Sequence, residues 1–133
     1  MKAQPCIYLE RLALLRQKLG RAGVDVCLIN QPLDLFYLTG LQLSAGQLFV
    51  HKTEAHLFVD GRYIAVAHMH APVPSSLYQE ADLVAFLRRC KAKRLGFDSA
   101  HMAYDQVKAL EAVIDVPLVP LGAVLNTLRL VKD

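Results

Sequence analysis

Apolar residues recur along this chain with two alternating periods, which predicts helices and strands in turn. Across residues 8–22 they return every three or four positions, with arginine and lysine residues between them, and this spacing is typical of an amphipathic helix. Gly23 is well placed to end that helix in the left-handed conformation. The apolar run over residues 24–29 then predicts a short buried strand.

The next segment carries helix signals on both sides of a predicted hairpin. Pro32 suits the first turn of a second helix, and Gly40 closes that helix. Residues 47–50 and 55–59 are rich in β-forming side chains and are separated by a short polar spacer, which predicts an antiparallel hairpin. Asp60 follows directly, and we expect its carboxylate to cap a third helix.

The second half of the chain continues the alternation. Residues 71–74 contain two prolines, which end the third helix and begin a short extended piece. A fourth helix is expected next, with Leu83, Val84, Leu87 and Cys90 on its inner stripe, followed by a strand at residues 94–98. A helix at residues 103–114 then places Tyr104, Val107, Leu110 and Ile114 along one face. The last expected elements are an extended segment at residues 116–120 and a helix at residues 123–131. The prolines of the extended segment predict that it lies at a sheet edge.

Strands that alternate with helices predict an α/β fold, with three layers in the order α/β/α and helices on both faces of one sheet. The hairpin makes this sheet mixed rather than purely parallel. The length of 133 residues fits one domain over residues 1–133, without a repeat or a flexible linker.

Composition narrows the class of protein. The apolar fraction of 54% is above the usual range, so either a leucine-rich core or a surface that meets a partner accounts for the surplus. No apolar run approaches the ~20 residues that cross a bilayer, and the first residues lack a signal-peptide pattern, which favours a cytoplasmic protein with no membrane partner. The cysteines lack metal or disulfide spacing, and we interpret Cys27 and Cys90 as core residues.

The fourth predicted helix ends in a basic run: Arg88, Arg89, Lys91, Lys93 and Arg94. Cations at the end of a helix interact well with its dipole and stay solvated, and no aromatic residues stand between these charges. We therefore expect no nucleic-acid partner.

Residue patterns for catalysis are missing. The histidines show no metal-binding spacing, no serine stands in a Gly-x-Ser-x-Gly context, and no phosphate-binding loop occurs, so we expect no catalytic residue and no metal in this chain. Asp60, Arg62 and Tyr63 are the candidates for a functional role, because they lie where a strand ends and a helix begins. The residues alone favour a structural interpretation, in which Asp60 caps the helix, Arg62 is a solvated charge and Tyr63 is a packed ring.

Two motifs resemble those of one family. Residues 34–40, Asp-Leu-Phe-Tyr-Leu-Thr-Gly, and residues 60–63, Asp-Gly-Arg-Tyr, resemble the Asn-Ile-Tyr-Tyr-Leu-Thr-Gly and Asp-Gly-Arg-Tyr motifs of the amino-terminal domain of the creatinase, prolidase and aminopeptidase P family. Residues 95–98 and 128–133 are similar to later landmarks of that domain. Asp34 and Phe36 depart from the commoner asparagine and tyrosine.

The resemblance implies a ribonuclease H-like domain that precedes a "pita-bread" metallopeptidase domain, which this chain lacks. In such enzymes two divalent metal ions, expected to be manganese, cobalt or zinc, activate water for hydrolysis of Xaa-Pro bonds in proline-containing peptides. The amino-terminal domain contacts the catalytic domain and forms a homodimer or a higher homo-oligomer. Tyr37, Asp60, Arg62 and Tyr63 would then mark the interface or the edge of the substrate entrance.

Two alternatives stay open. The chain could act as a stand-alone non-catalytic protein-binding module of the same fold, with the basic run over residues 88–94 as its contact surface. It could also be the amino-terminal domain of a creatinase-like amidinohydrolase.

Overall fold

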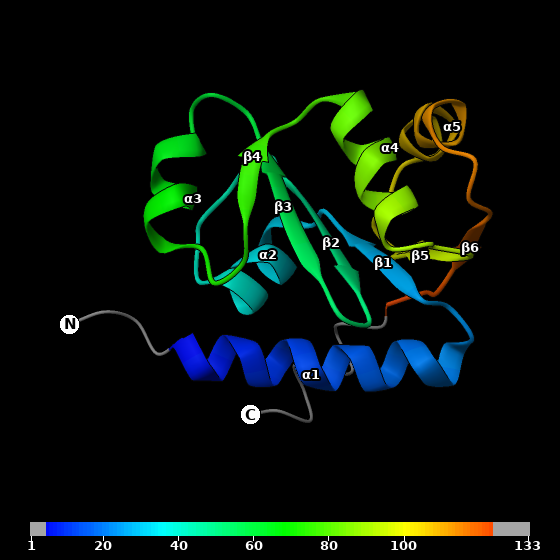
Figure 1. The fold of residues 1–133 in the computed structure, drawn as a ribbon, viewed down its shortest axis with the longest axis horizontal. Helices are drawn as coiled ribbons and strands as arrows, with labels where there is room; N and C mark the ends of the chain where they lie inside the picture. The colour runs from blue at the N-terminus through cyan, green and yellow to red at the C-terminus, as the bar shows by residue number, and fades with distance from the viewer. Residues whose placement is uncertain (1–4, 124–133) are drawn as a thin grey trace.

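A computed structural model of the protein describes residues 5–123 as one six-stranded sheet with helices packed against it (Figure 1). The elements, in chain order, are α1 (Pro5–Ala22), β1 (Val26–Ile29), α2 (Pro32–Thr39), β2 (Gln47–His51), β3 (Ala55–Val59), α3 (Ile64–His70), β4 (Ser75–Leu77), α4 (Glu80–Arg89), β5 (Leu95–Phe97), α5 (Tyr104–Val113) and β6 (Leu118–Pro120). Nearly every expected element is present, and its ends lie within three residues of the expected ones.

The sheet is mixed, as the hairpin predicts. Its strand order is β4-β3-β2-β1-β5-β6. The neighbours β1 and β2 and the neighbours β2 and β3 are antiparallel, whereas the three remaining pairs are parallel. β6 lies at one edge, where its prolines predict it, and the extended piece after residues 71–74 forms the opposite edge as β4.

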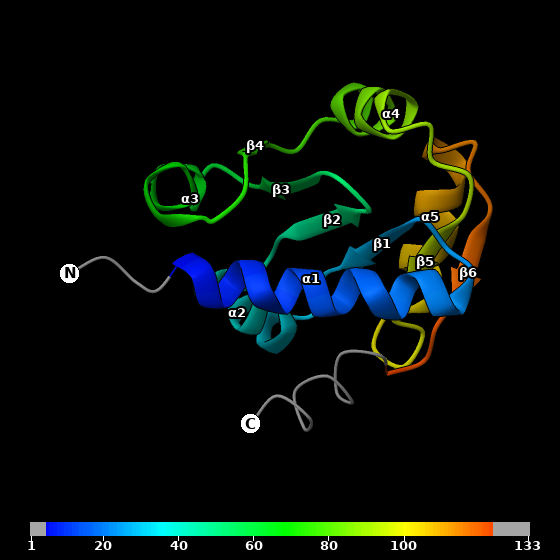
Figure 2. The same ribbon diagram turned by 60° about the horizontal axis from the view of Figure 1, so that its bottom comes forward.

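Helices cover both faces of the sheet, which confirms the three-layer α/β/α prediction. Side chains alternate between the faces along each strand. In β1, Cys27 and Ile29 join the core beneath α1 and α2, while Val26 and Leu28 join the core beneath α4 and α5. Figure 2 shows α1 below the sheet and α4 above it.

Two predicted glycine stops are confirmed, because Gly23 and Gly40 both have a φ of 78°. Gly40 is needed for a second reason. A Cβ atom at this position would lie 2.6 Å from the hydroxyl oxygen of Tyr8, so a side chain at residue 40 would displace the Tyr8 ring from the end of α2. Gly96 similarly lets Leu121 pack closely, since a Cβ atom there would lie 2.4 Å from Leu121 Cδ1.

Two expectations about helices are wrong, and a third concerns residues outside the described range. Asp60 does not cap α3, which begins at Ile64 without a side-chain cap, because the Asp60 carboxylate is bound to Arg62 instead. Tyr104 does not face the core: it is the first residue of α5 and is 73% exposed. The last expected helix, over residues 123–131, lies outside the described residues apart from its first position.

No helix within residues 5–123 is both long enough and apolar enough to cross a membrane.

Candidate functional site

Asp60 and Arg62 form an exposed ion pair in the turn between β3 and α3. The Asp60 carboxylate accepts a hydrogen bond from the backbone N–H of Arg62 at 3.0 Å and one from Arg62 Nη2 at 2.9 Å. Tyr63 N–H donates to the carbonyl of Asp60 at 3.1 Å and closes the turn. The acid and the guanidinium are thus held together by a tight turn over residues 60–63.

The charges of this pair stabilise each other. Hydrogen bonds from Arg62 hold the pKa of Asp60 below its ordinary value, and Asp60 in turn raises the pKa of Arg62. The side chains are 45% and 65% exposed, so solvent screens the pair. Arg62 Nε and Nη2 already donate to Asp60, so a partner carboxylate would bind through the remaining donors of the guanidinium.

Tyr63 ties this turn to the loop that follows α2. Its hydroxyl lies 2.5 Å from Ser44 Oγ and accepts the backbone N–H of Ser44 at 3.3 Å. These hydrogen bonds lower the pKa of Tyr63. The Arg62 guanidinium carbon lies 4.9 Å from the centroid of the Tyr63 ring, within the range of a cation–π contact. We call Ser44, Asp60, Arg62 and Tyr63 the turn cluster.

Tyr37 lies elsewhere, in the interior between α1 and α2. It is 8% exposed, and the Arg11 guanidinium carbon lies 4.1 Å from the centroid of its ring. Arg11 Nη1 also donates to the Tyr37 carbonyl at 2.7 Å. The structure therefore brings together three of the four residues proposed from the sequence and places Tyr37 as a packing residue beneath Arg11.

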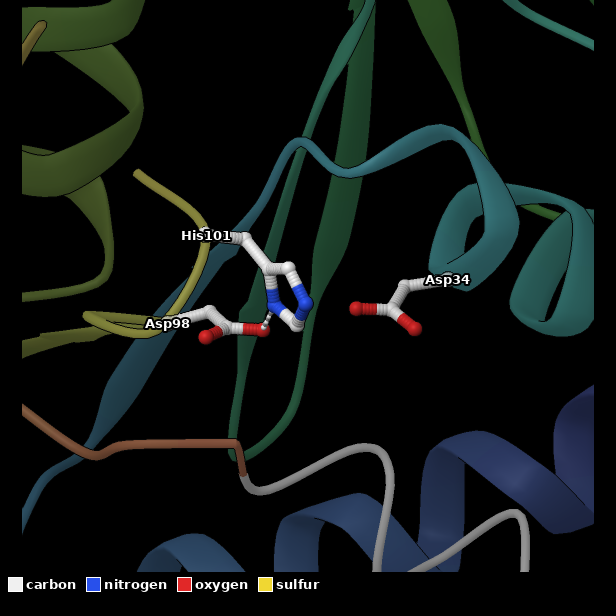
Figure 3. A group of neighbouring side chains, drawn as sticks. All are labelled: Asp34, Asp98 and His101. Atoms are coloured by element: carbon white, nitrogen blue, oxygen red, sulfur yellow. Dashed lines mark hydrogen bonds and ion pairs between the residues drawn. The ribbon is translucent and has the colours of Figure 1, made fainter. Parts of the chain in front are cut away.

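A second group of polar residues meets at the carboxyl ends of β1 and β5 (Figure 3). Asp34 stands in the first turn of α2, and Asp98 follows β5 directly. The Asp98 carboxylate accepts the backbone N–H of Ala100 at 3.0 Å and pairs with His101 Nδ1 at 2.9 Å. Figure 3 shows the imidazole of His101 between the two carboxylates.

Within the described part of the chain, these three residues are the group with the geometry to hold a cation, since their ligand atoms lie within 4.8 Å of one another. Two aspartates and one histidine are too few for a two-metal centre, in which bridging carboxylates hold ions ~3.5–4 Å apart. The bonds that Asp98 makes to Ala100 and His101 also serve the turn after β5 directly. Residue spacing could not reveal this group, because β1 and β5 become neighbours only in the folded sheet.

The other chemically notable residues have structural roles. His56 bonds to Ser76 Oγ at 2.8 Å, and His68 bonds to the Ser75 carbonyl at 3.0 Å. Burial raises the pKa of Cys27 to about 12 and that of Cys90 to about 11, so both thiols stay protonated, in line with their interpretation as core residues.

Comparison with known proteins places this chain in a family. Residues 11–131 match the profile of the Creatinase/Prolidase N-terminal domain. An uncharacterized peptidase of Bacillus subtilis, YqhT, is 30% identical over 128 residues, a match that covers 92% of this chain and 36% of that protein. The chain thus spans about a third of the length of this relative.

Solved structures share the fold. A Bacillus anthracis Xaa-Pro dipeptidase superposes with a TM-score of 0.85 at 21% identity, over 92% of this chain and 36% of its own. The aminopeptidase P of Streptococcus thermophilus gives 0.80 at 25% identity, over 92% and 95%. The amino-terminal domain of the Mycobacterium tuberculosis cytoplasmic peptidase PepQ gives 0.77 at 26% identity, over 85% and 93%.

The fold, the order of the motifs and the match over nearly the whole chain agree with the resemblance seen in the sequence. The chain belongs to the creatinase/prolidase N-terminal domain family.

Proposed function

We propose that this chain serves as the non-catalytic amino-terminal domain of an Xaa-Pro peptidase. The observation that carries the proposal is the family match over residues 11–131, on a chain that spans 36% of the length of its Bacillus subtilis relative. Hydrolysis would take place in the part of the protein that corresponds to the remaining length of that relative. Two divalent metal ions, manganese, cobalt or zinc, would activate the attacking water there.

The turn cluster is the surface that we assign to the edge of the substrate entrance or to the contact with the catalytic domain or a partner subunit. Arg62 supplies a guanidinium whose position is fixed by Asp60, and Tyr63 joins that turn to Ser44. A partner carboxylate would meet a pre-oriented cation at this point, which lowers the entropy cost of binding. Tyr37 supports this surface only indirectly, through α2.

We further propose that the protein forms a homodimer or higher homo-oligomer in the cytoplasm and acts on proline-containing peptides. The description of the Mycobacterium tuberculosis relative as a cytoplasmic peptidase supports the location.

The chain itself would bind no metal. Added Zn²⁺ or Mn²⁺ is then expected to leave its melting temperature unchanged, and a rise that the variant His101→Ala abolishes would instead assign a metal site to Asp34, Asp98 and His101.

The first test compares this chain with the longer protein that carries it. We expect the native mass in source cells, detected with an antibody against this domain, to be two to three times 14.8 kDa. The longer protein should cleave Xaa-Pro peptides when a divalent metal is added, while the 133-residue chain should not. A native mass near 14.8 kDa would contradict the peptidase and favour a stand-alone binding module.

The second test concerns Arg62. Substitution Arg62→Gln in the longer protein should weaken the oligomer or lower Xaa-Pro turnover, while Arg21→Gln, an exposed change in the last turn of α1, should do neither. Equal behaviour of the two variants would remove the turn cluster from the proposal and leave the peptidase assignment intact.

A further inference from the structure

A cavity of about 350 Å³ lies between the end of α4 and the connection from α5 to β6. Its volume is within the range of small-molecule sites, ~300–1,000 Å³. Most of its lining is apolar: Val84, Leu87, Ala92, Ile114, Val116 and Pro117. A second hollow shares Val84 and Arg88 with it and continues along the groove between α4 and α5.

Two cations and one acid complete the lining: Arg88, Lys91 and Asp115. Arg88 Nη2 lies 3.9 Å from Asp115 Oδ2, and their side chains are 75% and 92% exposed, so the two charges are only loosely paired. The polar lining therefore carries one net positive charge beside an apolar wall. This combination complements a ligand with one negative charge and an apolar body.

The backbone at the end of α4 places Lys91 at the cavity. Lys91 has a φ of 56° and is the one non-glycine residue with positive φ among those that the structure describes. It stands just past α4, where its N–H donates to the Arg88 carbonyl and the N–H of Ala92 donates to the Leu87 carbonyl. These two hydrogen bonds form a Schellman end to α4, which accounts for the left-handed backbone of Lys91. Glycine is the usual residue at this position, whereas lysine adds a side chain that lines the cavity.

We propose that this cavity binds a small apolar monocarboxylate. The apolar part of the ligand packs against Leu87, Ile114 and Val116, and its carboxylate accepts hydrogen bonds from Arg88 and Lys91. A dianionic phosphate would exceed the net charge of the lining. The site lies at the β6 end of the sheet, opposite the turn cluster beside α3 (Figure 1), and it is independent of the proposed peptidase role.

The test uses sodium octanoate as the probe and the 133-residue chain. Amide NMR spectra are recorded during a titration with octanoate and, as a matched control of opposite charge, with octylamine. We expect saturable shifts for octanoate centred on Leu87, Ala92 and Val116, and none of this kind for octylamine. Isothermal titration calorimetry gives the dissociation constant.

Two variants test the assigned cations. Lys91→Gly relieves the positive φ and should unfold no earlier than the parent chain, yet bind octanoate about tenfold more weakly, because a charge-assisted hydrogen bond is lost. Arg88→Gln should weaken binding to a similar extent. Lys93→Gln removes the same charge outside the cavity lining and should leave affinity unchanged.

Three results would overturn the proposal. The first is absence of saturable octanoate binding at millimolar concentration. The second is equal binding of octanoate and octylamine, which would mean that charge plays no part. The third is an unchanged affinity in both Lys91→Gly and Arg88→Gln.

Discussion

The two motifs that link this chain to its family have opposite settings in the structure. Residues 34–40 are mostly buried: Leu35 and Leu38 lie in the core, and Gly40 closes α2 against Tyr8. Residues 60–62 are at the surface, where Asp60 and Arg62 bind each other in the turn before α3, and Tyr63 alone is partly buried against the core. The first motif is explained by packing, whereas packing accounts for little of the second. Two motifs that are equally clear in the sequence therefore have different roles, and residues 60–63 are the motif whose charged groups are available to a partner.

The largest expected effect lies within the buried motif, at two adjacent residues of α2. Leu35 is 0% exposed and Phe36 is 47% exposed. Leu35→Ala should lower the free energy of unfolding by about 3 kcal/mol, because it removes buried methyl groups and leaves a cavity. Phe36→Ala should cost much less. Urea denaturation of both variants checks this, and similar losses would mean that α2 is not packed as described.

The two glycines of the motifs give the next contrast. Gly40→Ala should cost about 2 kcal/mol, since an L-residue is strained at positive φ and the new methyl group meets Tyr8. Gly61→Ala should be nearly neutral, because its φ is not positive and a Cβ atom there has nothing within 4 Å. Thermal and urea unfolding give both numbers. A Gly61→Ala variant as unstable as Gly40→Ala would contradict the assigned difference between the motifs.

A smaller effect is expected for acid stability at Asp60. The folded-state pKa of Asp60 is depressed by Arg62, so its stabilising contribution is present above the unfolded pKa of ~3.9 and is lost as pH falls through the lower folded value. A carboxyl-carbon NMR titration should show a pKa below that of an ordinary aspartate. Arg62→Gln should move it back up. An Asp60 pKa that does not respond to Arg62→Gln would show that the ion pair does not form in solution.

The smallest expected effect concerns the link from Tyr63 to Ser44. Hydrogen bonds from Ser44 lower the pKa of the Tyr63 phenol, and Ser44→Ala removes the side-chain contribution while it keeps the backbone N–H. An NMR titration of Tyr63 should show a modest rise of its pKa in this variant. Stability should barely change, because the contact is exposed. A pKa that stays constant would place Tyr63 away from the loop.

Most of the fold could be predicted because its signals are local. The hydrophobic periods and the glycine stops at Gly23 and Gly40 located elements within a few residues. The prediction that Asp60 caps α3 was wrong because a carboxylate can bind the backbone N–H two residues ahead as readily as it can cap a helix. The prediction that Tyr104 faces the core was wrong because periodicity does not reveal whether the neighbouring layer extends as far as the first residue of α5.

The candidate sites could likewise be predicted only where their residues are close together in the sequence. Asp60, Arg62 and Tyr63 are close in sequence, so their proximity could be foreseen, but the contact with Ser44 could not. Neither could the meeting of Asp34 with His101, which depends on the parallel pairing of β1 with β5. Such contacts are created by the sheet order, which no local pattern contains.

Hydrogen–deuterium exchange tests the central claim most directly, through a comparison of this chain alone with the longer peptidase that we propose carries it. If the exposed motif meets the catalytic domain or a partner subunit, the amides of residues 61–63 should exchange more slowly in the longer protein. The amides of residues 35–40 should exchange equally in both, because they are already buried in the isolated chain. Equal exchange at residues 61–63 in the two proteins would contradict the assignment of the turn cluster as the contact surface.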